Sequence, residues 1–136
     1  MVSAILAVAP TQPSHPPIIG IDVAKDHLDV AVLDPASVIA GSRPHPRETF
    51  RVATTASGLR RLITRLRALA PSLVVMEATG GYERGARSAC WDAAIPVAVV
   101  HPGRVRWFAK GAGYGAKTDR LDAILLAHYA LITQPQ

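Results

Sequence analysis

The stretch Ile18-Ile19-Gly20-Ile21-Asp22-Val23-Ala24 opens the predicted fold, because its branched apolar residues are typical of a β-strand. Alternate residues of a strand share a face, so Asp22 lies on the face of Gly20 and Ile18. The other face of this strand is apolar. Because glycine has no side chain, Gly20 leaves room beside the acid.

A hairpin and two strand-helix-strand units follow the first strand. Leu28 to Leu33 comes after a tight link, which predicts a β-hairpin, and residues 34–47 read as a loop rich in proline and glycine. Three further strands are expected, from Glu48 to Thr54, from Leu73 to Met76 with Glu77 at its end, and from Pro96 to Val100. Four helices are expected between and after them: one capped by Ser57 and ended by Pro71, one from about Gly81 to Ala94, a short one over 103–110 and a terminal helix.

This order of elements predicts an α/β fold. Three strands followed by two right-handed crossovers give a mixed five-stranded sheet with helices on both faces. In that arrangement the first and fourth strands can lie side by side. Asp22 and Glu77 then sit near the crevice at the switch point of the sheet, where α/β folds tend to place their sites.

The stretch Lys117-Thr118-Asp119-Arg120-Leu121-Asp122-Ala123 places two carboxylates three residues apart at the start of the terminal helix, where Thr118 can serve as the N-cap. An acid in a first helical turn complements the helix dipole without any function, which accounts for Asp119 better than for Asp122. Both acids share a side with the apolar residues that face inward. Inward carboxylates are costly unless they are paired, hydrogen-bonded or bound to metal.

The terminal helix, returning across the sheet edge, would bring its two acids to Asp22 and Glu77. Four crowded carboxylates cannot all stay ionised unless cations neutralise them, and two Mg²⁺ ions balance their charge. A pair of such ions can activate a nucleophile and steady the leaving oxygen in phosphodiester chemistry. We therefore expect Mg²⁺ or Mn²⁺ as cofactor, and the expected catalytic residues and metal ligands are Asp22, Glu77, Asp119 and Asp122.

Composition indicates a folded domain with a polyanionic partner. The chain is 49% hydrophobic and 18% charged, and it has 15 Lys and Arg against 10 Asp and Glu. One cysteine, Cys90, allows no internal disulfide and fits a reducing cytoplasm. Residues 1–17 are expected to be a flexible leader before a domain over 18–136, and no stretch reaches membrane-spanning length.

Two basic stretches are candidate nucleic-acid surfaces. The residues expected to contact phosphates are Arg104, Arg106, Lys110 and Lys117. Trp107 could add a stacking surface, although Trp107 and Phe108 are more commonly core residues. The four arginines between residues 55 and 70 fit a solvated helix face better than a nucleic-acid surface.

The remaining polar residues receive simpler interpretations. Asp26, Asp29 and Glu83 are expected to be surface acids, and Tyr82 is expected to pack rather than react. His27, His101 and His128 are scattered along the sequence. We expect them in a loop, at a strand end and on a helix surface, respectively, rather than as catalytic bases. No cysteine or histidine cluster has zinc-site spacing.

Four segments closely resemble one known family. They are Ile19–Lys25, Met76–Glu83, Val99–Pro102 and Ala116–Ala123. Together, in this order and spacing, they are similar to the N-terminal domain of the DEDD transposases of the "one-ten" insertion sequences, which are related to the Piv and MooV DNA invertases. The resemblance implies a RuvC-like (ribonuclease H-like) fold and a DEDD tetrad at Asp22, Glu77, Asp119 and Asp122.

The resemblance also implies a function. It implies Mg²⁺-dependent cleavage and strand transfer in DNA transposition, with the element ends and target DNA as partners, a structured guide RNA and a bacterial cytoplasmic, nucleoid-associated location. Family members continue through a coiled coil into a domain that supplies a nucleophilic serine, whereas this sequence ends at Gln136. We therefore expect a chain that is incomplete for strand exchange. The terminal helix is also apolar on its far side, which predicts cover from a second subunit or a missing domain.

Two alternatives stay open. One is a truncated, non-catalytic DNA- or RNA-binding module with the same fold. The other is half of a sugar-kinase or actin-like ATPase, since that superfamily also opens with a strand of this kind. Val23 and Ala24 argue against the ATPase, because they replace the small turn residues that would approach a phosphate.

Overall fold

A computed structural model of the chain describes residues 15–38, 43–114 and 119–135, with the backbone alone at 119–121. The leader expected over residues 1–17 lies almost wholly outside these ranges. The strands are β1 (Ile18–Val23), β2 (His27–Leu33), β3 (Glu48–Ala53), β4 (Leu73–Glu77) and β5 (Val97–Val100). The helices are the 3₁₀ turn η1 (Pro35–Ser37), α2 (Ala56–Leu69), α3 (Arg84–Asp92), α4 (Pro102–Gly111) and α5 (Asp119–Thr133).

The five strands form one mixed sheet in the order β3-β2-β1-β4-β5. β1, β2 and β3 pair antiparallel along the chain, whereas β1 pairs with β4, and β4 with β5, in parallel. The predicted mixed five-stranded sheet is confirmed, including the contact between the first and fourth strands. β1 therefore lies where the antiparallel and the parallel halves of the sheet meet.

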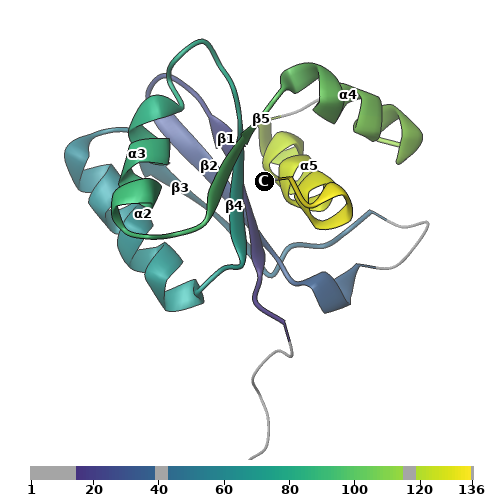
Figure 1. The fold of residues 1–136 in the computed structure, drawn as a ribbon, viewed down its shortest axis with the longest axis horizontal. Coiled ribbons are helices and arrows are strands. Elements are labelled where there is room, and N and C mark those ends of the chain that lie inside the picture. Colours follow the sequence, from purple (N-terminus) through teal and green to yellow (C-terminus); the bar gives the residue numbers. More distant parts are fainter. Residues whose placement is uncertain (1–14, 39–42, 115–118, 136) are drawn as a thin grey trace, which may run out of the picture.

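Helices cover both faces of the sheet (Figure 1). α2 and α3 lie on one side, over a core that includes Ile19, Ile21 and Met76. α5 and α4 lie on the other side, over a second core that includes Ile18 and Val75. Successive residues of β4 thus alternate between two separate hydrophobic clusters, with Val74 and Met76 in the first and Leu73 and Val75 in the second, as strand geometry requires.

Helix α2 begins two residues earlier than the sequence suggested. Thr55 is the N-cap, and its hydroxyl oxygen accepts a hydrogen bond from the backbone N–H of Gly58 at 3.1 Å. Ser57, the expected cap, lies inside the first turn with its hydroxyl 3.2 Å from that of Thr55. The helix ends at Ala70, which adopts a left-handed conformation before Pro71. Leu62 and Leu66 are fully buried on its inner side.

Helix α5 makes a close backbone contact with β1. A Cβ atom at Gly20 would collide with the carbonyl oxygen of Ala123 and lie 2.7 Å from the backbone nitrogen of Ala127. Gly20 is therefore required for this approach. At the other end of the strand, Ile18 lines a cavity together with Ala130. The helix therefore runs antiparallel to β1, and its first turn reaches the carboxyl end of the strand.

Part of the far side of α5 is covered within the chain. Leu125 and Tyr129 are buried in the second core, and Phe108 of α4 packs there, with its ring edge-on to Tyr129 at 5.6 Å between centroids. Helix α4 therefore covers Leu125 and Tyr129, whereas Ile124 is only half-buried, and cover of α5 by a second subunit or a further domain stays a prediction. Among the described residues no helix is long and apolar enough to cross a membrane.

Candidate active site

Asp22 and Glu77 lie at the carboxyl ends of adjacent parallel strands. The last paired residues of β1 and β4 are Ile21 and Met76, and these two acids follow directly. Adjacent strands are about 4.8 Å apart. Both carboxylates share the face of Gly20 and Val75, the face that α5 covers, because alternate residues of a strand point the same way. The structure thus brings together the two strand acids of the predicted tetrad.

The first turn of α5 reaches the same edge. Two residues of strand from Gly20 to Asp22 span about 6.6 Å, and four residues of helix from Ala123 back to Asp119 span about 6 Å. Because the two elements are antiparallel, Asp119 begins α5 at the level of Asp22. Asp122 is half-buried, and its Oδ1 atom is shielded from solvent. The Asp119 side chain lies outside the described part of the structure.

The carboxylates are the right donors for a hard divalent cation. Oxygen ligands suit Mg²⁺, and the predicted acids come from three elements that meet at one edge of the sheet. Among the side chains that the structure describes, which include Asp22, Glu77 and Asp122, no group of three or more His, Cys, Asp or Glu residues is arranged to hold a metal ion. The tetrad as a metal site therefore stays a prediction.

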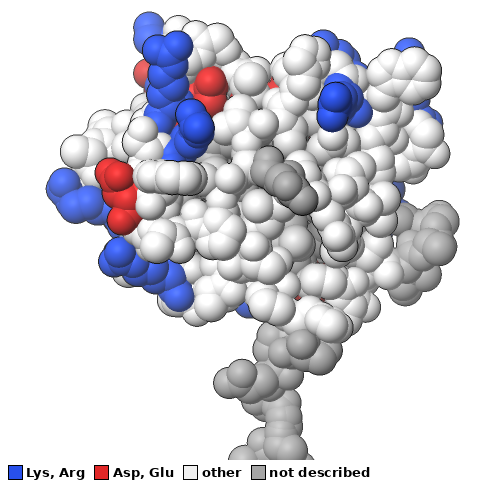
Figure 2. All heavy atoms as spheres, in the orientation of Figure 1, with Lys and Arg blue, Asp and Glu red and all other residues white. Residues whose placement is uncertain are grey.

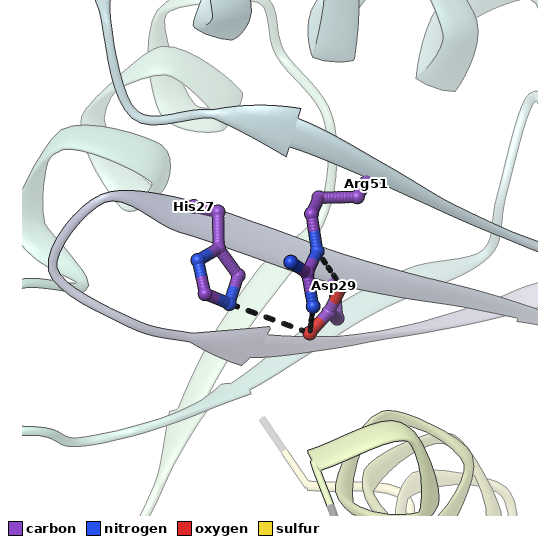
Figure 3. A network of polar contacts seen from close by, with 3 residues as sticks. All are labelled: His27, Asp29 and Arg51. Carbon is purple, nitrogen blue, oxygen red and sulfur yellow. Dashed lines mark hydrogen bonds and ion pairs between the residues drawn. The ribbon is translucent and has the colours of Figure 1, made fainter.

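A fifth carboxylate, Asp29, lies beside the predicted site. Asp29 of β2 is the cross-strand partner of Asp22, so both point to the α5 face. Figure 3 shows that its carboxylate accepts two hydrogen bonds from the guanidinium of Arg51, at 2.7 and 3.1 Å, with His27 at 3.6 Å. Asp29 is therefore not the simple surface acid that we expected. Arg51 of β3 is the cross-strand partner of Asp29, so this ion pair depends on the register of β2 and β3.

The turn after Glu77 is organised by Glu83. Its Oε1 atom accepts hydrogen bonds from the backbone N–H groups of Thr79 and Gly81 and from the Thr79 hydroxyl, each at 3.0 Å. Hydrogen bonding to the backbone at Thr79 is the main cause that lowers the pKa of Glu83 to about 2. Glu83 is partly exposed, but the expectation of a surface acid did not include these hydrogen bonds. Tyr82, expected to pack, is instead 55% exposed.

Helix α4 carries the basic residues that we expected to contact phosphates. Arg104, Arg106 and Lys110 are all exposed, whereas Lys117 falls outside the described residues. Trp107 is 82% exposed, so it is not a core residue, although Phe108 packs inward as expected. Figure 2 shows Lys and Arg gathered over α4 and, separately, over α2 and α3.

The histidines take structural positions. At the end of β5 His101 caps α4, and its Nδ1 accepts a hydrogen bond from the N–H of Gly103 at 2.9 Å. His128 is buried rather than on a helix surface, with its Nδ1 2.8 Å from the Tyr114 hydroxyl. Burial lowers the pKa of His128 and raises the pKa of Tyr114 to about 12. We assign neither His101 nor His128 a role as a base.

Known structures share this architecture. The RuvC structure of Thermus thermophilus is similar with a TM-score of 0.62 at 18% identity, covering 88% of this chain and 98% of that one. The Fowlpox virus resolvase, in a complex with Holliday junction DNA, is similar with a TM-score of 0.56 at 12% identity, covering 85% of this chain and 99% of that one. These likenesses confirm the predicted RuvC-like fold.

The sequence itself identifies the family. No curated protein matches the chain. A family model for the DEDD transposases of the "one-ten" insertion sequences, described as "Transposase", matches residues 19–136. Because this match spans most of the sequence, the chain belongs to the DEDD transposase family.

Proposed function

We propose that this chain is the catalytic domain of a DNA transposase, which cleaves and transfers phosphodiester strands with the help of divalent metal. The proposed catalytic residues and metal ligands are Asp22, Glu77, Asp119 and Asp122. The observation that carries this proposal is the register of β1 and β4. The last residues paired in that register are Ile21 and Met76, and Asp22 and Glu77 follow them directly, which supports a shared site.

Mg²⁺, or Mn²⁺ in its place, would be held by these carboxylates. Such ions activate a nucleophilic oxygen and stabilise the charge that develops on the leaving oxygen. The chain's own contribution is to fix the donors on rigid elements. β1 and β4 hold two of them in a parallel ladder, and Gly20 lets α5 approach closely enough to offer the others.

DNA is the proposed substrate, as element ends and target. The similar RuvC of T. thermophilus was solved in complex with a Holliday junction substrate. On this chain, α4 starts where β5 ends, and Val100 pairs with Glu77, so the helix leaves the sheet next to the proposed site. The proposed contacts to backbone phosphates are made by the exposed basic residues of α4, which are Arg104, Arg106 and Lys110, together with Lys117.

Three finer points rest on the family alone. We propose a structured guide RNA as a partner, action in the bacterial cytoplasm, and a need for groups beyond those described here to complete strand exchange. The family match is what supports these points.

The direct test is cleavage or strand transfer on element-end DNA in Mg²⁺. Asp22→Asn keeps the size of the side chain but removes its charge, so activity should fall by about 10³-fold, which corresponds to about 4 kcal/mol. Asp34→Asn is the matched control. Asp34 follows β2 at the opposite end of the β1–β2 ladder, where it pairs with Arg47. Equal activity of Asp22→Asn and wild type would refute the proposed site.

A non-catalytic nucleic-acid-binding module is the second candidate. It is favoured by the exposed Arg104, Arg106 and Lys110 of α4, because basic side chains can bind phosphates without any metal. Such a module would bind DNA or RNA with steep salt dependence but show no metal-dependent reaction with either.

A further inference from the structure

The turn between β4 and α3 is folded around one carboxylate oxygen. Glu83 Oε1 accepts from three donors, two on Thr79 and one on Gly81, all at 3.0 Å and partly shielded from solvent. This turn begins with Ala78, directly after Glu77. Charge-assisted hydrogen bonds of this kind are stronger than neutral ones, so Glu83 holds the turn in a single shape.

The backbone of the turn depends on these contacts. Gly80 and Gly81 adopt φ values of 82° and 121°, which favour glycine. Two glycines in succession make a flexible segment, and the Glu83 carboxylate joins its two ends by binding Thr79 and Gly81. Without that carboxylate, two partly buried backbone N–H groups would lose their acceptor.

Glu77 is held on both sides. On its amino side it belongs to the β4 ladder, between β1 and β5. On its carboxyl side the N–H of Ala78 donates to the carbonyl oxygen of Val100 at 3.1 Å, and the next residue, Thr79, is bound by Glu83. The Glu83 contacts therefore continue the restraint on the main chain for two residues beyond the proposed metal ligand.

We propose that Glu83 is a positioning residue, which orients Glu77 for metal by fixing the Thr79–Gly81 turn. This inference rests on the proposed function. Glu83 is not proposed as a ligand itself, because its Oε1 atom already accepts three hydrogen bonds. Groups that orient metal ligands in this way typically contribute about 10- to 100-fold in metal affinity.

The experiment measures the dissociation constant of Mn²⁺ by electron paramagnetic resonance on the full chain. Glu83→Ala should weaken Mn²⁺ binding by about 10-fold or more. Glu83→Gln should lose less, because its amide oxygen can still accept from Thr79 and Gly81. The matched control is Glu48→Ala, which removes a glutamate paired with Arg65 on the edge strand and should leave Mn²⁺ affinity unchanged.

A melting temperature without metal is recorded for each variant, so that a general loss of stability is separated from a loss of positioning. If Glu83→Ala does not fold, Thr79→Val removes one of the three donors and should weaken Mn²⁺ binding in the same direction, but less. Wild-type Mn²⁺ affinity in a folded Glu83→Ala or Thr79→Val variant overturns the inference alone. Absence of Mn²⁺ binding in the wild type overturns the proposed function as well.

Discussion

The two faces of the sheet are built in different ways. Under α2 and α3, large side chains such as Leu62, Leu66 and Met76 interlock in a fully buried core. Under α5, the contact with β1 is made by Gly20 against the backbone of Ala123 and Ala127. The first face gains stability from side-chain volume. The second gives up volume at Gly20 so that a helix can approach β1 closely, and the proposed catalytic carboxylates lie on this face.

The largest expected effect comes from Gly20→Ala. The added methyl group collides with backbone atoms of α5, which cannot move aside as a side chain can, so the cost should be about 3 kcal/mol in unfolding free energy. Urea denaturation measures it. α5 would also be displaced from β1, so we expect the response of the melting temperature to Mg²⁺ to weaken.

Leu62→Ala, on the face that α2 and α3 cover, tests whether the two faces of the sheet differ in their effect on metal binding. It should cost a similar free energy, about 3 kcal/mol, through a cavity in the α2 core. Because that cavity is remote from the carboxylate face, Mg²⁺ should raise the melting temperature of this variant as it does in the wild type. The two faces would be equivalent, contrary to our interpretation, if both variants lost the Mg²⁺ response equally.

A smaller effect is expected from metal itself. A ligand that binds only the folded state stabilises it by about 2.7 kcal/mol at 100 times its dissociation constant. Mg²⁺ or Mn²⁺ should therefore raise the melting temperature, and replacing both Asp119 and Asp122 with Ala should abolish that shift. The double variant Arg60→Ala/Arg61→Ala, on exposed positions of α2, should retain it. An undiminished shift in the aspartate variant would contradict the metal site.

The smallest expected effect is a pH dependence on the α5 face. Burial lowers the pKa of His128 below its ordinary 6.5, so the unfolded chain takes up this proton first. Stability should be fully present above about pH 6.5 and should decline as the pH falls towards the pKa of the folded state. His128→Gln should flatten that decline in urea titrations between pH 7 and 5. His45→Gln, at an exposed histidine, should leave the decline unchanged.

Most of the framework could be predicted from local patterns. Period-two strands and the helical spacing of apolar residues gave each strand and helix to within a few residues, because burial imposes those periods. Asp22 and Glu77 could be proposed as site residues because each sits at the end of an apolar strand. The hydrogen bonds of Asp29 and Glu83, which lie near the proposed site, were not predicted. Their partners depend on strand register and on a turn conformation, which composition does not reveal.

Which side chains of a helix are buried could not be predicted from the sequence either. Trp107 and Phe108 are neighbours of the same chemical class, yet one is 82% exposed and the other packs against α5. His128, expected on a helix surface, is buried beside Tyr114. Which side of a short helix faces inward depends on the neighbouring element, and that contact exists only after the chain has folded.

The sequence by itself determined the order of the elements, the family and the acids that end the strands, since these follow from residues close together along the chain. Only the tertiary structure decided which of those acids share a face and which carboxylates are already bound by other groups. The physical reason is the close approach at Gly20 and the register of β1 with β4. Both join segments far apart in the sequence.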